Sequence, residues 1–194
     1  AVGLDVGLAF IRWLTGAENL HYGLWSGLEV TAGNLRAAQD NYSTKLFGYL
    51  PEGRLRILDI GGGAGETAKK LLALGHQVEI VVPSPFLAAR CRETAKGATV
   101  HETTFEEFEG TGHYDLCLFS ESFQYIPLTE SLPKCARLLA PGGKGVLSKF
   151  KTTFETPLIP SIFIGLALRG FEAELPTLAA QPIHSNDAGD RLEL

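Results

Sequence analysis

The sequence predicts an α/β fold with a doubly wound, mostly parallel sheet, helices on both faces and an N-terminal helical lid. From residue 54 onward, short apolar runs typical of strands alternate with amphipathic segments typical of helices. Such alternation produces right-handed crossover units around a parallel sheet. The preceding residues carry helical patterns and no strand pattern. We therefore expect a helical cap over residues 1–53 and one compact α/β unit over residues 54–194.

The cap is predicted to contain two helices joined by an aromatic loop. Residues 1–14 are mostly apolar and residues 17–27 are typical of a loop. From residue 30 to residue 50, apolar side chains recur at helical spacing, and a Pro-Glu-Gly sequence then ends the helix. The start of the chain lacks the basic residues and the cleavage site of a signal peptide.

The α/β unit is predicted element by element from the same patterns. We expect strands at 55–60, 77–82, 98–101, 115–119 and 145–150. We expect helices at 65–74, 85–95 and 130–139, a turn or short helix at 105–108 and a turn at 140–143. Beyond them, residues 157–168 are a helix candidate and residues 170–175 a strand candidate, while the remaining tail has no firm period.

Composition and charge exclude several classes of protein. The 194 residues carry a net charge of −5 without a basic cluster, which argues against a nucleic-acid partner. No apolar run reaches the length of a membrane span. Cys91, Cys117 and Cys135 lie inside predicted helices or strands without metal-ligand spacing. We therefore expect buried free thiols, no metal site and a cytoplasmic location.

A glycine-rich turn joins the first predicted strand to the helix after it. Its glycines are Gly61, Gly62, Gly63 and Gly65. Glycine adopts backbone angles closed to other residues and lets a ligand approach the main chain. The N-terminus of the following helix offers free N–H groups and a positive dipole end. In open α/β sheets, ligands bind at such a position, outside the carboxyl ends of the strands.

The residues around this turn narrow the choice of ligand. A dinucleotide fingerprint requires a third glycine where the chain has Glu66, and a phosphate-binding P-loop requires Gly-Lys-Ser/Thr at its end, which this turn lacks. A cofactor with a cationic or zwitterionic part near Asp59 remains. The string LDIGGGAGE resembles motif I of the class I S-adenosylmethionine-dependent methyltransferases. A plain tight turn between strand and helix is the alternative, although it needs fewer glycines.

The resemblance covers residues 15–150. The strings NLHYGLW (19–25), DLCLFSESFQYI (115–126) and CARLLAPGGKGVLSK (135–149) are similar to further segments of small-molecule methyltransferases. This resemblance implies a Rossmann-like fold and in-line transfer of a methyl group from S-adenosylmethionine to a small-molecule acceptor. S-adenosylhomocysteine would be the product. It leaves open the acceptor, the methylated atom and whether the chain forms a homodimer.

The resemblance also implies which residues meet the cofactor. They are Tyr22, Asp59, Gly61, Gly62, Gly63, Gly65, Pro83, Ser84, Thr104, Phe105 and Ser120. Pro83 is a departure, because the family usually places an acid there that binds both ribose hydroxyls. Three explanations stay open: another group such as Ser84, a water or Glu66 holds the ribose, the lid tightens binding, or the domain has lost the cofactor. Phe105 either stacks on adenine or is a core aromatic.

Methyl transfer from a sulfonium needs alignment more than chemical help. The candidate catalytic residues are His21, Tyr22, Glu121, Gln124 and Tyr125. His21 has an unperturbed pKa near neutrality and would serve as a base for a protonated nucleophile, or else it packs against Trp25. Glu121 would neutralise the sulfonium or bind an amine, or else it caps the next helix.

Two other functions remain open on the same fold. One is an enzyme that cyclises or cleaves the aminocarboxypropyl chain of S-adenosylmethionine and releases methylthioadenosine. The other is a non-catalytic binding module, which would turn over no acceptor. An NAD-type oxidoreductase is disfavoured, because Glu66 replaces the third glycine and no acid follows about twenty residues later.

Overall fold

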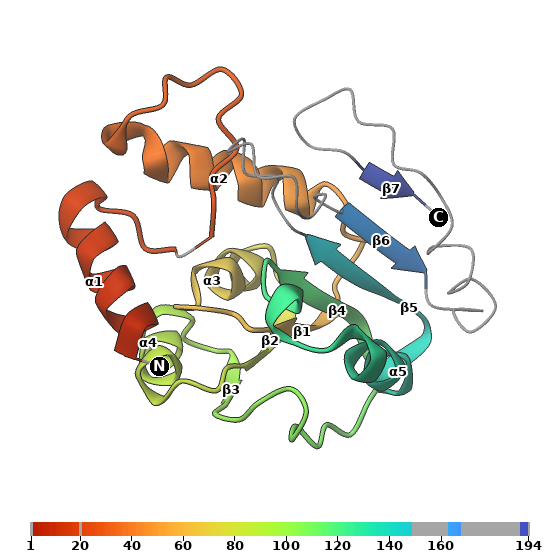
Figure 1. The fold of residues 1–194 in the computed structure, drawn as a ribbon. Helices are drawn as coiled ribbons and strands as arrows, with labels where there is room; N and C mark the ends of the chain where they lie inside the picture. Colours follow the sequence, from red (N-terminus) through yellow and green to blue (C-terminus); the bar gives the residue numbers. More distant parts are fainter. Residues whose placement is uncertain (1, 20, 149–162, 168–190, 194) are drawn as a thin grey trace.

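The computed structural model describes residues 2–19, 21–148, 163–167 and 191–193. These residues form a sheet with the strand order β3-β2-β1-β4-β5-β6-β7 (Figure 1). Its strands are β1 (Arg56–Ile60), β2 (Gln77–Val81), β3 (Thr99–His101), β4 (Tyr114–Ser120), β5 (Leu139–Ser148), β6 (Phe163–Ala167) and β7 (Arg191–Glu193). All neighbouring strands run parallel except β5 and β6. The predicted mostly parallel sheet is confirmed.

The strand order reverses at β1, which positions the site. β1 pairs with β2 on one side and with β4 on the other, so that Asp59 lies between Ile80 and Leu118. The next strands continue outward in both directions. Such a reversal is the topological switch point of a doubly wound sheet, where a crevice opens at the carboxyl ends of the strands.

The helices lie close to their predicted positions. They are α1 (Val2–Thr15), α2 (Leu35–Phe47), α3 (Glu66–Ala73), α4 (Pro85–Thr94) and α5 (Leu128–Leu138), with 3-10 turns η1 (Ala32–Asn34) and η2 (Phe123–Tyr125). The predicted helix over residues 30–50 is shorter, because the chain is extended at Thr31 and passes through η1 before α2 begins. None of the described helices is long and apolar enough to cross a membrane.

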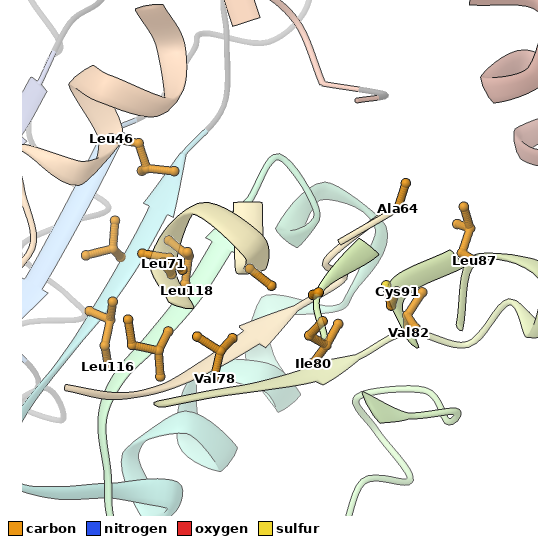
Figure 2. Packing of buried hydrophobic residues seen from close by; sticks show 14 of the residues in the cluster. Leu46, Ala64, Leu71, Val78, Ile80, Val82, Leu87, Cys91, Leu116 and Leu118 are labelled. Atoms are coloured by element: carbon orange, nitrogen blue, oxygen red, sulfur yellow. The ribbon is translucent and has the colours of Figure 1, made fainter. Parts of the chain in front are cut away.

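Two hydrophobic clusters occupy the two faces of the sheet. On one face, Ile57, Ile80 and Leu118 share a cluster with side chains of α3 and α4, and Figure 2 shows Leu71 of α3 beside Leu118. On the other face, Leu58 and Cys117 pack against α5 and the segment after β3. Both faces are therefore buried, as the apolar character of β1 and β4 requires.

The described C-terminal part differs from the prediction. Residues 163–167, placed in a helix candidate at 157–168, form strand β6, which pairs antiparallel with β5. A short apolar run such as FIGLA fits a buried strand and a buried helix equally well, so periodicity alone cannot distinguish them. The predicted turn at 140–143 lies within β5, where the pairing jumps from Leu139 to Lys144. The remaining residues of the helix candidate and the predicted strand at 170–175 lie outside the described part.

The N-terminal helices pack on the α/β unit through few side chains. Leu8 of α1 and both Tyr42 and Leu46 of α2 belong to the cluster that covers α3 and α4, and each is 1% exposed. Lys70 of α3 bonds Asp40 of α2, with 2.6 Å between Nζ and Oδ1. The division at residue 53 stays a prediction, because these contacts join the two parts without defining a boundary.

Leu8→Ala should lower the free energy of unfolding by about 2–4 kcal/mol, because it empties a buried site between α1 and the core. Leu14→Ala is the matched control on the same helix. Leu14 is 53% exposed, so its truncation should change stability by no more than about 0.5 kcal/mol. Denaturant unfolding of both variants measures the difference, and equal effects would show that α1 is not anchored through Leu8.

Candidate active site

A cavity of about 500 Å³ opens at the carboxyl ends of the central strands. Its wall combines the glycine turn after β1, the end of β2, the segment after β3, the turn after β4 and part of the loop between α1 and α2. The volume lies within the range of small-molecule sites. The cavity therefore occupies the crevice that the reversed strand order creates.

Gly61 and Gly62 leave no room for side chains. A Cβ at Gly61 would overlap the side chain of Ser122, which follows β4. A Cβ at Gly62 would stand 2.7 Å from Oδ2 of Asp59 and 2.7 Å from Cγ2 of Ile80. These two glycines are required by the packing of the protein itself, with or without a ligand.

Gly63 and Gly65 have different surroundings although both have left-handed backbone angles, with φ values of +56° and +87°. A Cβ at Gly63 would meet no atom within 4 Å, and this residue lines the cavity. Gly65 does not line the cavity. A Cβ at Gly65 would stand 3.0 Å from Cα of Cys91 on α4. Of the four predicted cofactor-binding glycines, Gly65 thus provides close packing between α3 and α4, and Gly63 provides space for a ligand.

Cys91 supports this turn from below. Its Sγ donates a hydrogen bond to the carbonyl oxygen of Gly63 at 3.2 Å. Burial raises the pKa of this thiol to about 12, so it stays protonated and keeps the donor. The side chain therefore positions the turn, and it is not poised to react.

Asp59 lies beneath the glycine turn and not in the cavity wall. Its side chain is fully buried, and neither carboxyl oxygen has a hydrogen-bond partner within the described ranges. Burial raises its pKa to about 7, because an ionised carboxylate loses its hydration there. The residue can therefore meet a cofactor only through the turn that covers it.

Residues predicted to meet adenosine also line the cavity. Pro83 and Ser84 come from the end of β2, and Thr104 and Phe105 from the segment after β3. The Ser84 hydroxyl caps α4 by accepting the N–H of Leu87 at 3.3 Å. Phe105 belongs to the buried cluster on the α5 face, so it is a core aromatic that also reaches the cavity.

Glu66, a candidate for holding the ribose, does not face the cavity and makes other interactions. It is 9% exposed, does not line the cavity and pairs with Lys69, with 3.3 Å between Oε1 and Nζ. Its carboxylate lies in the first turn of α3, where a negative charge interacts favourably with the helix dipole. Another carboxylate, Glu106, lines the cavity beside Phe105.

The segment around His21 and Tyr22 is bonded to α2. Nε2 of Gln39 donates to the carbonyl oxygens of Asn19 at 3.2 Å and of His21 at 2.7 Å. Gly23 packs against Ala38, with no room for a Cβ. These bonds fix a segment without regular structure over the cavity, where both His21 and Tyr22 line the wall.

His21 is held as a neutral imidazole. Its Nδ1 lies 2.8 Å from the carbonyl oxygen of Tyr22, which can only accept, so Nδ1 carries the proton. Its ring lies against the Tyr42 ring at 4.5 Å between centroids, and burial lowers its pKa to about 4. Nε2 therefore presents a lone pair, buried and without a partner among the described residues.

Glu121 connects the end of β4 to the N-terminal segment. Its Oε2 accepts the backbone N–H of Tyr22 at 3.1 Å, and its Oε1 is buried without a partner in the described part of the chain. The residue has a φ of +62°, which is uncommon for a residue with a side chain and typical of functional sites. Burial raises its pKa to about 7. The adjacent Ser120 bonds the hydroxyl of Tyr42 at 3.1 Å.

The structure brings most of the predicted site residues together. The cavity wall contains His21, Tyr22, Gly61, Gly62, Gly63, Pro83, Ser84, Thr104, Phe105, Ser120, Glu121 and Tyr125. Gln124 belongs to η2. Sequence reasoning missed Gln39, Tyr42 and Cys91, which support the wall from α2 and α4. No three His, Cys, Asp or Glu side chains cluster as metal ligands in the described ranges.

Comparison with protein families and curated proteins agrees with this geometry. A family model described as a methyltransferase domain matches residues 57–143. A ubiquinone biosynthesis O-methyltransferase of Xanthomonas oryzae pv. oryzae is 32% identical over 105 residues, which is 50% of this chain and 44% of that protein. The chain thus spans less than half the length of this curated relative.

Solved structures share the fold. N-methyltransferase NodS of Bradyrhizobium japonicum, in complex with S-adenosylhomocysteine, matches with a TM-score of 0.52 and 23% identity over 57% of this chain and 61% of its own. A TehB-like methyltransferase of Corynebacterium glutamicum matches with a TM-score of 0.57 and 16% identity over 77% and 73%. At these identities the likeness extends to the fold and no further.

Asp59→Asn should stabilise the protein at high pH. Because the pKa of Asp59 is about 7 in the folded protein and ordinary in the unfolded chain, its contribution to stability is lost as the pH rises from about 4 to 7. The neutral variant should gain on the order of 2–4 kcal/mol at pH 8 and little at pH 4. Unfolding at both pH values tests this, with the exposed Glu107→Gln as control. A variant less stable at pH 8 than the wild type would contradict it.

Proposed function

We propose that this chain, which belongs to the class I S-adenosylmethionine-dependent methyltransferase superfamily, transfers the methyl group of S-adenosylmethionine to a small-molecule acceptor. The carrying observation is Gly63, whose missing side chain leaves the cavity open while Gly61, Gly62 and Gly65 are required by internal packing. A plain tight turn would not need a position such as Gly63, where the absent side chain leaves space in a cavity. This open position favours a ligand-binding turn.

The residues present fit this cofactor along the length of the cavity. The backbone of Gly61–Gly63 would border its methionine and ribose parts, and Leu87 and Phe105 offer apolar surface for adenine. Ser84, Thr104 and Glu106 offer oxygen atoms where Pro83 provides none. The cofactor supplies a methyl group already activated on a sulfonium, so this chain's own residues need to bind, align and exclude water.

His21 is better suited to orient an acceptor than to remove its proton. With a pKa of about 4, its imidazole is a weak base at neutral pH, whereas general base catalysis is most effective near the operating pH. Its Nε2 lone pair, which has no partner among the described residues, is free to accept a hydrogen bond from an acceptor hydroxyl or amine. Tyr125, which is 79% exposed at the cavity wall, would lie on the side where the acceptor enters.

The acceptor is proposed only as a small molecule. The curated relative is named for O-methylation in ubiquinone biosynthesis and NodS for N-methylation, so similar proteins methylate different atoms. The alternative reaction, in which the aminocarboxypropyl chain is cyclised or cleaved, would release methylthioadenosine without an acceptor. Incubation with S-adenosylmethionine alone, followed by product analysis, separates it from methyl transfer.

Gly63→Arg should weaken cofactor binding strongly, because the new side chain would occupy the cavity. Calorimetric titration with S-adenosylhomocysteine should give micromolar affinity for the wild type and at least about tenfold weaker binding for the variant. Gly75→Arg is the matched control: Gly75 follows α3, has a φ of +90° and would also meet no atom, but it does not line the cavity. Equal losses in both variants would point to backbone strain, and no binding to the folded wild type would overturn the proposal.

A further inference from the structure

We infer that the Glu121 carboxylate pairs with the positively charged sulfonium of the cofactor. The cavity then binds S-adenosylmethionine more tightly than the product S-adenosylhomocysteine, whose sulfur is neutral. This inference rests on the proposed function, because it concerns the same cavity. It goes further by assigning product discrimination to one carboxylate. This difference in binding between the two ligands requires no catalytic base, acceptor substrate or metal ion.

The bonding of Glu121 leaves one carboxyl oxygen for a ligand. The residue is 8% exposed and lines the cavity, and Tyr22 supplies a backbone N–H to Oε2. Oε1 is buried and has no partner in the described residues. A buried carboxylate oxygen without a partner is unfavourable, so a cation bound in the cavity would relieve an existing cost.

Glu121 has a backbone conformation that is unfavourable for a residue with a side chain. Its φ of +62° belongs to the left-handed region, which residues with a side chain seldom adopt. Ser122 anchors the turn by donating to the carbonyl oxygen of Ile60 and by packing against Gly61. The same turn therefore fixes both the glycine loop and the carboxylate, which keeps their relative position constant.

The surroundings favour a sulfonium over an ammonium. An ammonium group requires several hydrogen-bond acceptors, whereas a sulfonium has no N–H or O–H donors and is satisfied by charge and by aromatic surface. Glu121 has a single unpartnered oxygen, and the nearby wall includes the side chains of His21, Tyr22 and Tyr125. One negative charge beside aromatic rings matches a weakly hydrated cation.

The other titratable groups around Glu121 do not replace it. His21 is neutral, Tyr22 and Tyr125 line the cavity, and Tyr42 packs against the His21 ring. Asp59 lies beneath Gly62 and does not line the cavity, and Glu106 lines it next to Phe105. Because burial raises the pKa of Glu121 to about 7, the carboxylate is only half formed at neutral pH in the free protein, and a cation would draw it into the ionised form.

Methyl transfer removes the charge that Glu121 reads. As the acceptor attacks the methyl carbon, the carbon–sulfur bond breaks and its electron pair returns to sulfur, which becomes a neutral thioether. The positive charge moves to the acceptor, which then loses a proton if it carries one. Glu121 is left without its counter-charge, so binding of the thioether product is weakened and its release is favoured.

The test is calorimetric titration of S-adenosylmethionine and S-adenosylhomocysteine at pH 6 and pH 8. With a pKa of about 7 in the free protein, ionisation of Glu121 should strengthen wild-type binding of S-adenosylmethionine about tenfold between the two pH values. Glu121→Gln should lose this part of the pH dependence and the preference for the charged ligand. Asp59 and the ligand's own amino group titrate in both proteins, so the comparison removes their contribution.

Two further variants guard the interpretation. Glu107→Gln is the control, an exposed carboxylate that does not line the cavity, and it should keep both the preference and the pH dependence. Thermal melting shows whether Glu121→Gln is folded. If it is not, Glu121→Asp replaces it as the test: this variant keeps the charge and should keep both the preference for S-adenosylmethionine and the pH dependence.

Either of two results would overturn the inference while leaving the proposed function intact. One is an equal gain for both ligands between pH 6 and pH 8, which would mean that a charge common to both is read. The other is a Glu121→Gln protein that keeps the wild-type preference. A folded wild type that binds neither ligand would instead overturn the proposed function, and the inference with it.

Discussion

The structure depends on the absence of room for side chains along the turn between β1 and α3. A Cβ at Gly61 would overlap Ser122, one at Gly62 would overlap Asp59, and one at Gly65 would stand 3.0 Å from Cα of Cys91. Side chains at Gly61, Gly62 and Gly65 would therefore strain the turn, whatever it binds. Since the main chain is held on these sides, its remaining open side at Gly63 becomes the wall of a cavity at the switch point of the sheet.

Two buried carboxyl groups accompany this turn and give the site its electrostatic character. Asp59 supports the turn from below and Glu121 ends the neighbouring strand, and burial raises the pKa of both to about 7. Neither carboxyl group pairs with a basic side chain among the described residues. Such an arrangement costs stability in the free protein at high pH, and it is compatible with a ligand that brings its own positive charge.

The sequence predicted what is encoded locally. Strand and helix periods gave β1 to β4 and α3 to α5 within a few residues, and the glycine spacing located the turn. Contacts between distant segments were not predictable: the hydrogen bond from Cys91 to Gly63, the clamp of Gln39 and the bond between Tyr42 and Ser120 have no local signal. The apolar run at 163–167 was wrongly predicted as helix, because only its pairing with β5 makes it a strand.

Hydrogen exchange of the whole chain, with and without S-adenosylhomocysteine, tests the central claim most directly. The account predicts that the ligand slows exchange both at residues 61–65 and at residues 19–24, because the glycine turn and the segment clamped by Gln39 border one cavity. Protection confined to other parts of the chain, with the glycine turn exchanging as in the free protein, would contradict the claim that this turn binds the cofactor.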